Sequence, residues 1–140
     1  NVMLVGNQDN QGLFAASDFA IAASGTVTLE LALAEVPTVV VYKGNAVNAL
    51  IGHCLVNRDS IVLPNRILER PIFPLLLQNE CNPQALVTSL MGLINTISIS
   101  EEMKLASAKI RKRLNTGNGT SSNIAAQVII SELDIIDAVT

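Results

Sequence analysis

The chain has 140 residues, of which 49% are hydrophobic and 15% are charged, and its formal net charge is −3. This length and apolar content suit one globular domain with a buried core and exclude intrinsic disorder. The negative charge and the aromatic content of 3% argue against a nucleic-acid-binding protein, which needs basic patches and stacking side chains. The two cysteines, Cys54 and Cys81, form no Cys-x-x-Cys pair, so a thiolate zinc site has no support and a reducing compartment is expected.

Neither a signal peptide nor a membrane-spanning helix is evident in the sequence. The long apolar region 19–42 is interrupted by Glu30, Glu35 and Pro37, which makes it a poor spanning segment. The chain begins without an initiator methionine, and the apolar residues 2–5 predict a β-strand. We therefore expect residues 1–140 to form a single domain that is part of a longer protein.

Residues 13–42 carry the pattern of a βαβ unit preceded by a short helix. A short helix is predicted over 13–16, a buried strand over 19–23 and an apolar helix over 26–35, which Pro37 ends. The β-branched run 38–42 is typical of a strand covered on both faces of a parallel sheet. The predicted fold class is therefore α/β, a Rossmann-like parallel sheet flanked by helices, with its ligand site at the carboxyl ends of the strands.

The turn between the strand 19–23 and the next helix is the strongest candidate site. Ser24, Gly25 and Thr26 stand where the unpaired N–H groups of a first helical turn can bind an anion, and glycine lets the anion approach the backbone. Glu30 lies one turn further on the same face, where its carboxylate can accept hydrogen bonds from a pair of sugar hydroxyls. The pattern predicts a diphosphate on the turn and a ribose on Glu30. The alternative is an ordinary helix N-cap followed by a solvated glutamate.

Further polar residues accompany the next predicted elements. Residues 47–55 predict an amphipathic helix with His53 on its polar face, where a plain surface position competes with a role in proton transfer. Residues 61–63 predict a short strand, which places Asn65 on the cleft side of the sheet, although Pro-Asn is also an ordinary turn sequence. Both residues are candidates for a site at the carboxyl edge of the sheet.

The rest of the chain predicts a helical C-terminal region. Pro83 is expected at the first position of one helix, and residues 100–114 form another, with Met103, Ala106, Ile110 and Leu114 facing inward. A last helix follows residues 120–122, with four apolar residues expected inside: Ile124, Val128, Ile129 and Leu133. The helix 100–114 also carries five basic residues that form either a solvated face or contacts to anionic lipid headgroups: Lys104, Lys109, Arg111, Lys112 and Arg113.

Several common site motifs are missing from the sequence. It contains no G-x-G-x-x-G, Walker A or G-x-S-x-G sequence, and no Asp-x-Asp pair that could hold a metal beside a diphosphate. We therefore expect no metal and no cofactor. The charge of a bound phosphate would be met by backbone N–H groups and the helix dipole alone.

Four motifs together resemble one enzyme family, the bacterial lipid-A-disaccharide synthases, in its carboxyl-terminal half. The resemblance covers nearly the whole chain from about Ala16, and the order and spacing of the motifs match. The Ser-Gly-Thr…Leu-Glu element is shared loosely by many two-Rossmann-domain glycosyltransferases, whereas Leu-Pro-Asn and Leu-Leu-Gln point to this family. The motifs are the runs Ala23–Glu30, Pro37–Lys43, Leu63–Asn65 and Leu76–Cys81.

The resemblance implies a transferase that moves 2,3-diacylglucosamine from its UDP derivative to 2,3-diacylglucosamine 1-phosphate, which yields the lipid A disaccharide and UDP. It implies one half of a GT-B fold, with UDP held by this half and the acceptor side in an amino-terminal half. It also implies a bacterial cytoplasmic enzyme that is peripheral at the inner membrane, and it leaves a homo-oligomer open.

The resemblance further implies roles for individual residues. Asn65 corresponds to the family's functionally important Leu-Pro-Asn asparagine and is the candidate catalytic residue, and Gln78 would lie near the nucleotide. The chain departs from the family pattern after that motif, where Glu69 replaces a glycine and Pro71 an acidic residue. Arg70 between them matches the pattern and is a further candidate for the site. The residues implied for the diphosphate and ribose of UDP are Ser24, Gly25, Thr26 and Glu30.

In the implied reaction, UDP leaves the anomeric carbon and negative charge develops on its β-phosphate. Donors fixed at the helix N-terminus would stabilise that charge, each by roughly 3 kcal/mol. The general base would lie in the amino-terminal half, with His53 as a weaker alternative, so residues 1–140 alone are expected to be inactive. Two alternatives remain open: another UDP-sugar glycosyltransferase or epimerase of the same fold, and a non-catalytic Rossmann-like module.

Overall fold

The computed structural model describes residues 2–6, 10–44, 61–115 and 120–137. Its strands are β1 (Ala20–Ala23), β2 (Thr38–Tyr42) and β3 (Leu75–Leu77). Its helices are α1 (Asn10–Ala15), α2 (Thr26–Leu33), α4 (Leu63–Leu68), the 3₁₀ turn η3 (Gln78–Glu80), α5 (Pro83–Ile94), α6 (Ile99–Leu114) and α7 (Ser121–Asp137). This is the predicted α/β, Rossmann-like class with a helical C-terminal region.

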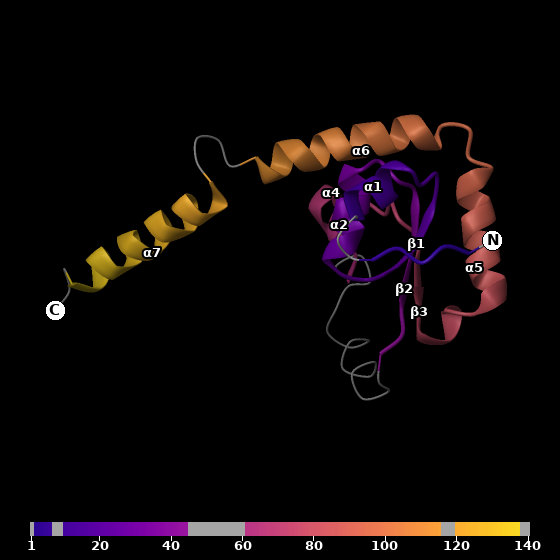
Figure 1. Cartoon of the computed structure of the whole chain (residues 1–140). Coiled ribbons are helices and arrows are strands. Elements are labelled where there is room, and N and C mark those ends of the chain that lie inside the picture. Colours follow the sequence, from indigo (N-terminus) through magenta and orange to yellow (C-terminus); the bar gives the residue numbers. More distant parts are fainter. Residues whose placement is uncertain (1, 7–9, 45–60, 116–119, 138–140) are drawn as a thin grey trace.

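The described strands form one parallel sheet in the order β1-β2-β3, which is confirmed as the core of a βαβ unit (Figure 1). The β1–β2 ladder begins at its amino end with the pair Ala20 and Thr38. The β2–β3 ladder finishes at its carboxyl end with the pair Tyr42 and Leu77. The central strand β2 is the most buried, as its β-branched sequence predicts, whereas Ile21 on the edge strand β1 is 51% exposed. The expectation of a fully buried first strand is therefore wrong for one of its faces.

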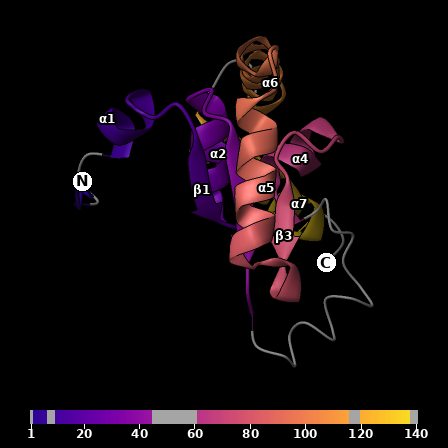
Figure 2. The same ribbon diagram turned by 90° about the vertical axis from the view of Figure 1, so that its right-hand side faces the viewer.

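Helices cover the two faces of the sheet unequally. The hydrophobic core lies between one face and helices α2, α4 and α6, while α5 packs against β2 from the other face (Figures 1 and 2). Met103, Ala106 and Ile110 of α6 are at most 1% exposed and pack in this core with Phe73. Their spacing along α6 places them on one stripe of the helix, which confirms three of the four inward positions predicted for it. The fourth, Leu114, is 46% exposed at the end of the helix.

The start of α5 follows the pattern predicted from sequence. Asn82 precedes the helix, and its side-chain oxygen accepts a hydrogen bond from the backbone N–H of Ala85 at 3.0 Å. Pro83 occupies the first helical turn, where its missing N–H leaves no acceptor unpaired. The short helix predicted over 13–16 is present as α1, a few residues earlier.

Three local predictions are wrong. Residues 2–5 lie in no ladder and are largely exposed, because no described strand pairs with them. Residues 61–63 form no strand either; α4 begins at Leu63, since Pro64 fixes a backbone angle suited to a first helical turn. The helix α7 exists but extends away from the sheet, and Val128 and Ile129 are 56% and 60% exposed rather than inside (Figure 1).

Two further expectations concern the predicted helix 47–55 and the presence of a membrane-spanning helix. The amphipathic helix predicted over 47–55, with His53 and Cys54, lies outside the described residues. Among the described residues, no helix combines the length and the apolar character needed to cross a membrane.

Candidate functional site at the carboxyl edge of the sheet

The carboxyl ends of the three strands bring together the segments that the sequence singled out. Ser24 to Thr26 follow β1, Lys43 and Gly44 follow β2, and Gln78 follows β3. The ladder itself continues into the first turn, because the Ser24 N–H donates to the carbonyl of Val41 at 3.0 Å. Because parallel strands end at one edge of the sheet, these segments share the position where open α/β sheets bind ligands.

Hydrogen bonds from inside the protein hold the turn between β1 and α2. The Ser24 hydroxyl donates to the carbonyl of Ile61 at 2.7 Å and so ties the turn to the segment before α4. The carbonyl of Gly25 accepts from the Thr28 hydroxyl at 2.7 Å and from the Thr28 N–H at 3.2 Å. Thr28 is fully buried, so this turn is fixed from the side of the core.

The first turn of α2 is left without a side-chain cap. Gly25 occupies the N-cap position, where no side-chain hydrogen bond is made, and Thr26 is exposed. A Cβ added to Gly25 would have no atom of the described residues within 4 Å, so the described part of the chain leaves the space beside the turn open. The free N–H groups and the positive end of the α2 dipole therefore face an accessible position, which is the chemistry that binds an anion.

Glu30 lies one helical turn beyond Thr26 and is exposed. Its side chain lines a groove of about 390 Å³ between α1, α2 and α6, together with Phe14 and Arg111. Leu33 and Ala34 form the part of the groove toward the C-terminal end of α2. The carboxylate of Glu30 is thus available to hydroxyl donors from outside, on the side of α2 that faces α1.

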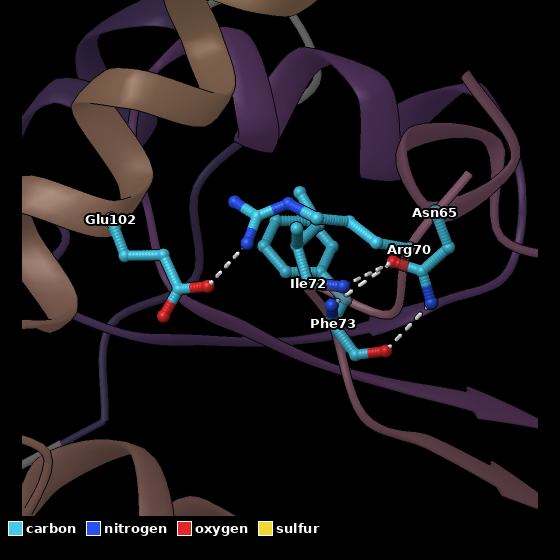
Figure 3. A network of polar contacts seen from close by, with 5 residues as sticks. All are labelled: Asn65, Arg70, Ile72, Phe73 and Glu102. Carbon is cyan, nitrogen blue, oxygen red and sulfur yellow. Dashed lines mark hydrogen bonds and ion pairs between the residues drawn. The ribbon is translucent and has the colours of Figure 1, made fainter. Parts of the chain in front are cut away.

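Asn65 is placed differently from the expected cleft-side position. It is 2% exposed, and its carboxamide oxygen accepts from the N–H groups of Ile72 and Phe73, both at 3.0 Å (Figure 3). Its amide nitrogen donates to the carbonyl of Phe73 at 2.9 Å. The side chain therefore fixes the turn that leads from α4 into β3, which the sequence could not indicate because these bonds form only once residues 65–73 have folded into the turn.

Arg70 also contributes to this turn. Its Nη1 lies 3.1 Å from Oε1 of Glu102 on α6, and its backbone N–H donates to the carbonyl of Asn65 at 3.1 Å (Figure 3). Its Nε is buried without a hydrogen-bond partner among the described residues. The side chain points toward α6, so Arg70 links the turn to that helix.

Glu69 explains one of the departures from the family pattern. It follows α4 as the C-cap residue, with φ of 56° and ψ of 30°, in the left-handed region that favours glycine. A glycine, which the resemblance implies at this position, would adopt this conformation without steric strain. Glu69 makes a 3.5 Å ion pair with Arg113, which offsets part of the backbone strain.

The basic residues of α6 have a role that sequence analysis missed. Arg111 donates to the carbonyl of Leu33 at 2.8 Å, and Arg113 donates to the carbonyl of Ile67. These carbonyls belong to the last turns of α2 and α4, where backbone acceptors have no helical partner. Lys104 pairs with Glu101 at 3.0 Å, and this hydrogen bond and charge raise the pKa of Lys104. Arg111 and Arg113 differ from solvated basic residues only in their contacts with distant helix ends, and no sequence signal reveals these contacts.

One candidate residue, His53, remains unplaced, and no metal cluster is found in the described part of the chain. His53 lies outside the described residues, so its relation to the edge of the sheet is not defined. Across residues 2–6, 10–44, 61–115 and 120–137, no group of three or more His, Cys, Asp or Glu side chains could hold a metal ion.

Comparison with known proteins shows the family of this chain. A family model described as Lipid-A-disaccharide synthetase matches residues 2–129. The chain belongs to the lipid-A-disaccharide synthase family. Similar proteins of this name are those of Nitrobacter hamburgensis, 34% identical over 94% of this chain, of Rhodospirillum centenum, 35% identical over 93%, and of Wigglesworthia glossinidia brevipalpis, 32% identical over 88%. The family is a glycosyltransferase family of lipid A biosynthesis, as the four sequence motifs indicated.

The match covers only part of each relative. The aligned regions make up 33% of the Nitrobacter hamburgensis protein and 32% of the other two. The chain thus spans about a third of the length of the curated relatives it matches.

Proposed function

We propose that this chain is the UDP-sugar-binding part, in the carboxyl-terminal half, of an enzyme that transfers 2,3-diacylglucosamine from UDP-2,3-diacylglucosamine to 2,3-diacylglucosamine 1-phosphate. The products are the lipid A disaccharide 1-phosphate and UDP. The family match over residues 2–129 carries this proposal. The enzyme works as a peripheral protein on the cytoplasmic face of the inner membrane, and residues 1–140 alone are inactive because the acceptor side lies elsewhere.

The diphosphate of UDP binds at the first turn of α2 in this proposal. The uncapped N–H groups after Gly25 and the open space beside it support this placement. Ser24 contributes by holding the turn, since its hydroxyl proton is already donated to Ile61 at 2.7 Å. The Thr26 hydroxyl is exposed and can donate to a phosphate oxygen. As UDP leaves, charge on the β-phosphate is stabilised by donors that need no rearrangement.

Glu30 binds the ribose of the same nucleotide. It lies one turn along α2 from Thr26, and its exposed carboxylate can accept both hydroxyl protons of a ribose. Asn65 supports transfer indirectly, because its carboxamide is used by Ile72 and Phe73 and is buried away from any ligand. It is a positioning residue in this proposal rather than the catalytic residue that the sequence suggested. The general base that activates the acceptor hydroxyl comes from the part of the enzyme beyond this chain.

The proposal is tested by kinetics of the full-length enzyme with Glu30→Ala. Loss of the carboxylate removes hydrogen bonds to the ribose, so KM for the UDP-sugar rises about tenfold while kcat changes little. Glu101→Ala is the matched control, because Glu101 is an exposed glutamate of α6 whose side chain is 73% accessible. An unchanged KM in Glu30→Ala would remove Glu30 from the site.

A second assay tests the substrate class. The wild-type enzyme is offered the diacylated donor and an unacylated UDP-N-acetylglucosamine, each with 2,3-diacylglucosamine 1-phosphate as acceptor. Transfer from the diacylated donor alone is the expected result. Transfer from the unacylated sugar with none from the diacylated donor would assign the chain to a different UDP-sugar enzyme of the same fold.

A further inference from the structure

The end of the β2–β3 ladder carries a side-chain contact that the proposed function does not use. Tyr42 and Leu77 are the last paired residues of the two strands. The chain beyond β2 continues through Lys43 to Gly44, and the chain beyond β3 turns at once into η3, which begins at Gln78 (Figure 1). Gln78 and Gly44 are therefore neighbours at the carboxyl edge, just past the point where main-chain pairing stops.

The carboxamide of Gln78 pairs with both polar backbone groups of Gly44. With the amide oriented by its hydrogen-bond network, its nitrogen donates to the Gly44 carbonyl at 3.2 Å and its oxygen accepts from the Gly44 N–H at 3.3 Å. A side-chain amide has the same donor and acceptor as a peptide group. The contact therefore extends the ladder by one further pair, with a side chain in place of a strand.

Gly44 lies beside the side chain of Tyr42. A Cβ at Gly44 would lie 3.1 Å from both Cε1 and the hydroxyl oxygen of Tyr42, which is tighter than ordinary van der Waals contact. The tyrosine is 41% exposed, so its ring lies at the surface of the edge. Gly44 is thus held through its backbone by Gln78 and limited on another side by the aromatic ring.

The backbone of Gln78 is set for this contact at some cost. Its φ is 49°, in the left-handed region that a residue with a side chain rarely adopts. Two bonds support the turn: the Leu77 N–H donates to the Glu80 carboxylate at 3.3 Å, and the Cys81 N–H donates to the Gln78 carbonyl at 3.1 Å. A glycine would fit this backbone with less strain, but it could not make the pair with Gly44.

We propose that Gln78 is a positioning residue that fixes the backbone of Gly44 at the carboxyl edge, and that it affects nucleotide binding through this backbone rather than by contact with the nucleotide. The link to the nucleotide rests on the proposed function. The pairing of Gln78 with Gly44 does not, because it exists in the protein without any ligand.

The pairing is tested first in the full-length, ligand-free protein labelled with ¹⁵N-glycine. Hydrogen exchange at the Gly44 amide is measured by NMR in the wild type and in Gln78→Ala. Loss of the accepting oxygen speeds exchange at Gly44 by about fivefold or more. Asn79→Ala is the matched control, because Asn79 is the exposed amide residue next in the chain, and it leaves Gly44 exchange unchanged.

The variant Gln78→Glu gives a pH-dependent readout that a general loss of stability would not produce. The ionised carboxylate can accept from the Gly44 N–H but faces the Gly44 carbonyl without a proton to donate. The protonated carboxyl group has the donor and acceptor of the native amide. The Gly44 resonance of Gln78→Glu therefore returns toward the wild-type position as pH falls through the carboxyl range, whereas that of Gln78→Ala does not.

UDP titration of the same proteins separates positioning from contact. We expect Gln78→Ala to weaken UDP binding severalfold together with faster exchange at Gly44 in the free protein. Weaker UDP binding with unchanged Gly44 exchange would overturn the proposal, because it would make Gln78 a direct contact. Faster Gly44 exchange with unchanged UDP affinity would overturn the positioning role. Absence of UDP binding by the wild type would refute the proposed function, and the Gly44 exchange would still decide the pairing.

Discussion

The two ends of helix α2 are treated in opposite ways. At its N-terminus, Gly25 provides no side-chain cap, and the space beside it is open. At its C-terminus, the last four carbonyls are all paired. The N–H groups of residues 34, 35 and 36 donate to those of Glu30, Ala32 and Leu31, and Arg111 and Ser107 donate to that of Leu33.

The difference teaches how a short helix can keep free donors at a ligand site. A glycine at the N-cap costs only a few tenths of a kcal/mol relative to a residue with a capping side chain. The opposite end is held by the hydrogen bonds of a Schellman-type end with Val36 buried, although Glu35, at φ of 65°, adopts the left-handed region at some cost in strain. Helix α6 adds the arginine and packs against α2. The helix is thus anchored by its C-terminal end, and its first turn is left available to an anion.

The largest expected effect comes from removing the packing that anchors the capped end. Met103 is 1% exposed in the core that includes Ala32 of α2. Met103→Ala leaves a cavity and lowers the free energy of unfolding by about 2–5 kcal/mol, measured by urea denaturation. UDP affinity of the folded fraction stays near the wild-type value, because the first turn of α2 is not touched. A loss below 1 kcal/mol would show that α6 does not anchor α2.

A smaller loss is expected from removing the cap itself. Arg111→Met keeps the apolar stem of the side chain but leaves the Leu33 carbonyl with Ser107 as its described partner at 3.2 Å. We expect destabilisation of about 1 kcal/mol, since the arginine is exposed and its bond is partly replaced by water. Lys112→Met is the control with the same change of charge, and it has an effect within about 0.5 kcal/mol. Equal effects of both variants would reduce Arg111 to a surface charge.

A gain of stability is expected at the corresponding end of α4. Glu69→Gly relieves the left-handed backbone at φ of 56° and loses the exposed ion pair with Arg113. The free energy gained by releasing the strain exceeds what is lost with the weak ion pair and with the added conformational entropy of the unfolded chain. The free energy of unfolding therefore rises by about 0.5 kcal/mol. Thermal unfolding of the two proteins checks this prediction. Glu69→Ala, which loses the pair and keeps the strain, is expected to be less stable than the wild type.

The smallest effect is expected on the outer face of α6. The side chain of Lys104 is 56% exposed, and the hydrogen bond that it donates to the Glu101 carboxylate raises the pKa of Lys104 above its ordinary value of 10.5. A raised pKa contributes stability that is fully present below pH 10.5 and is lost as pH rises through the folded value. Lys104→Ala therefore leaves the pH dependence of unfolding unchanged between about pH 6 and pH 9. This interval covers most of the range of about pH 5–8 where proteins are usually most stable and extends just above it. A slope that differs from the wild type in this range would contradict the assignment.

Much of the fold could be predicted because its signals are local. The β-branched run of β2, Pro83 at the start of α5 and the spacing of Met103, Ala106 and Ile110 each depend on a few neighbouring residues. The predictions that failed depended on distant partners. A segment such as 2–5 becomes a strand only when another strand pairs with it, and an apolar stripe such as that of α7 is buried only where something covers it.

The sequence by itself determined the family and the βαβ order, and it predicted the turn Ser24–Thr26 as the point where a ligand approaches. It could do so because periodicity, turn residues and the four motifs are read along the chain. Only the tertiary structure decided how Asn65, Gln78, Arg111 and Arg113 are used. Each of these side chains makes a hydrogen bond with a backbone group that is distant in the sequence or that lies in the turn between α4 and β3. A polar side chain looks the same in sequence whether it faces a ligand or a carbonyl, and its partner exists only once the chain has folded.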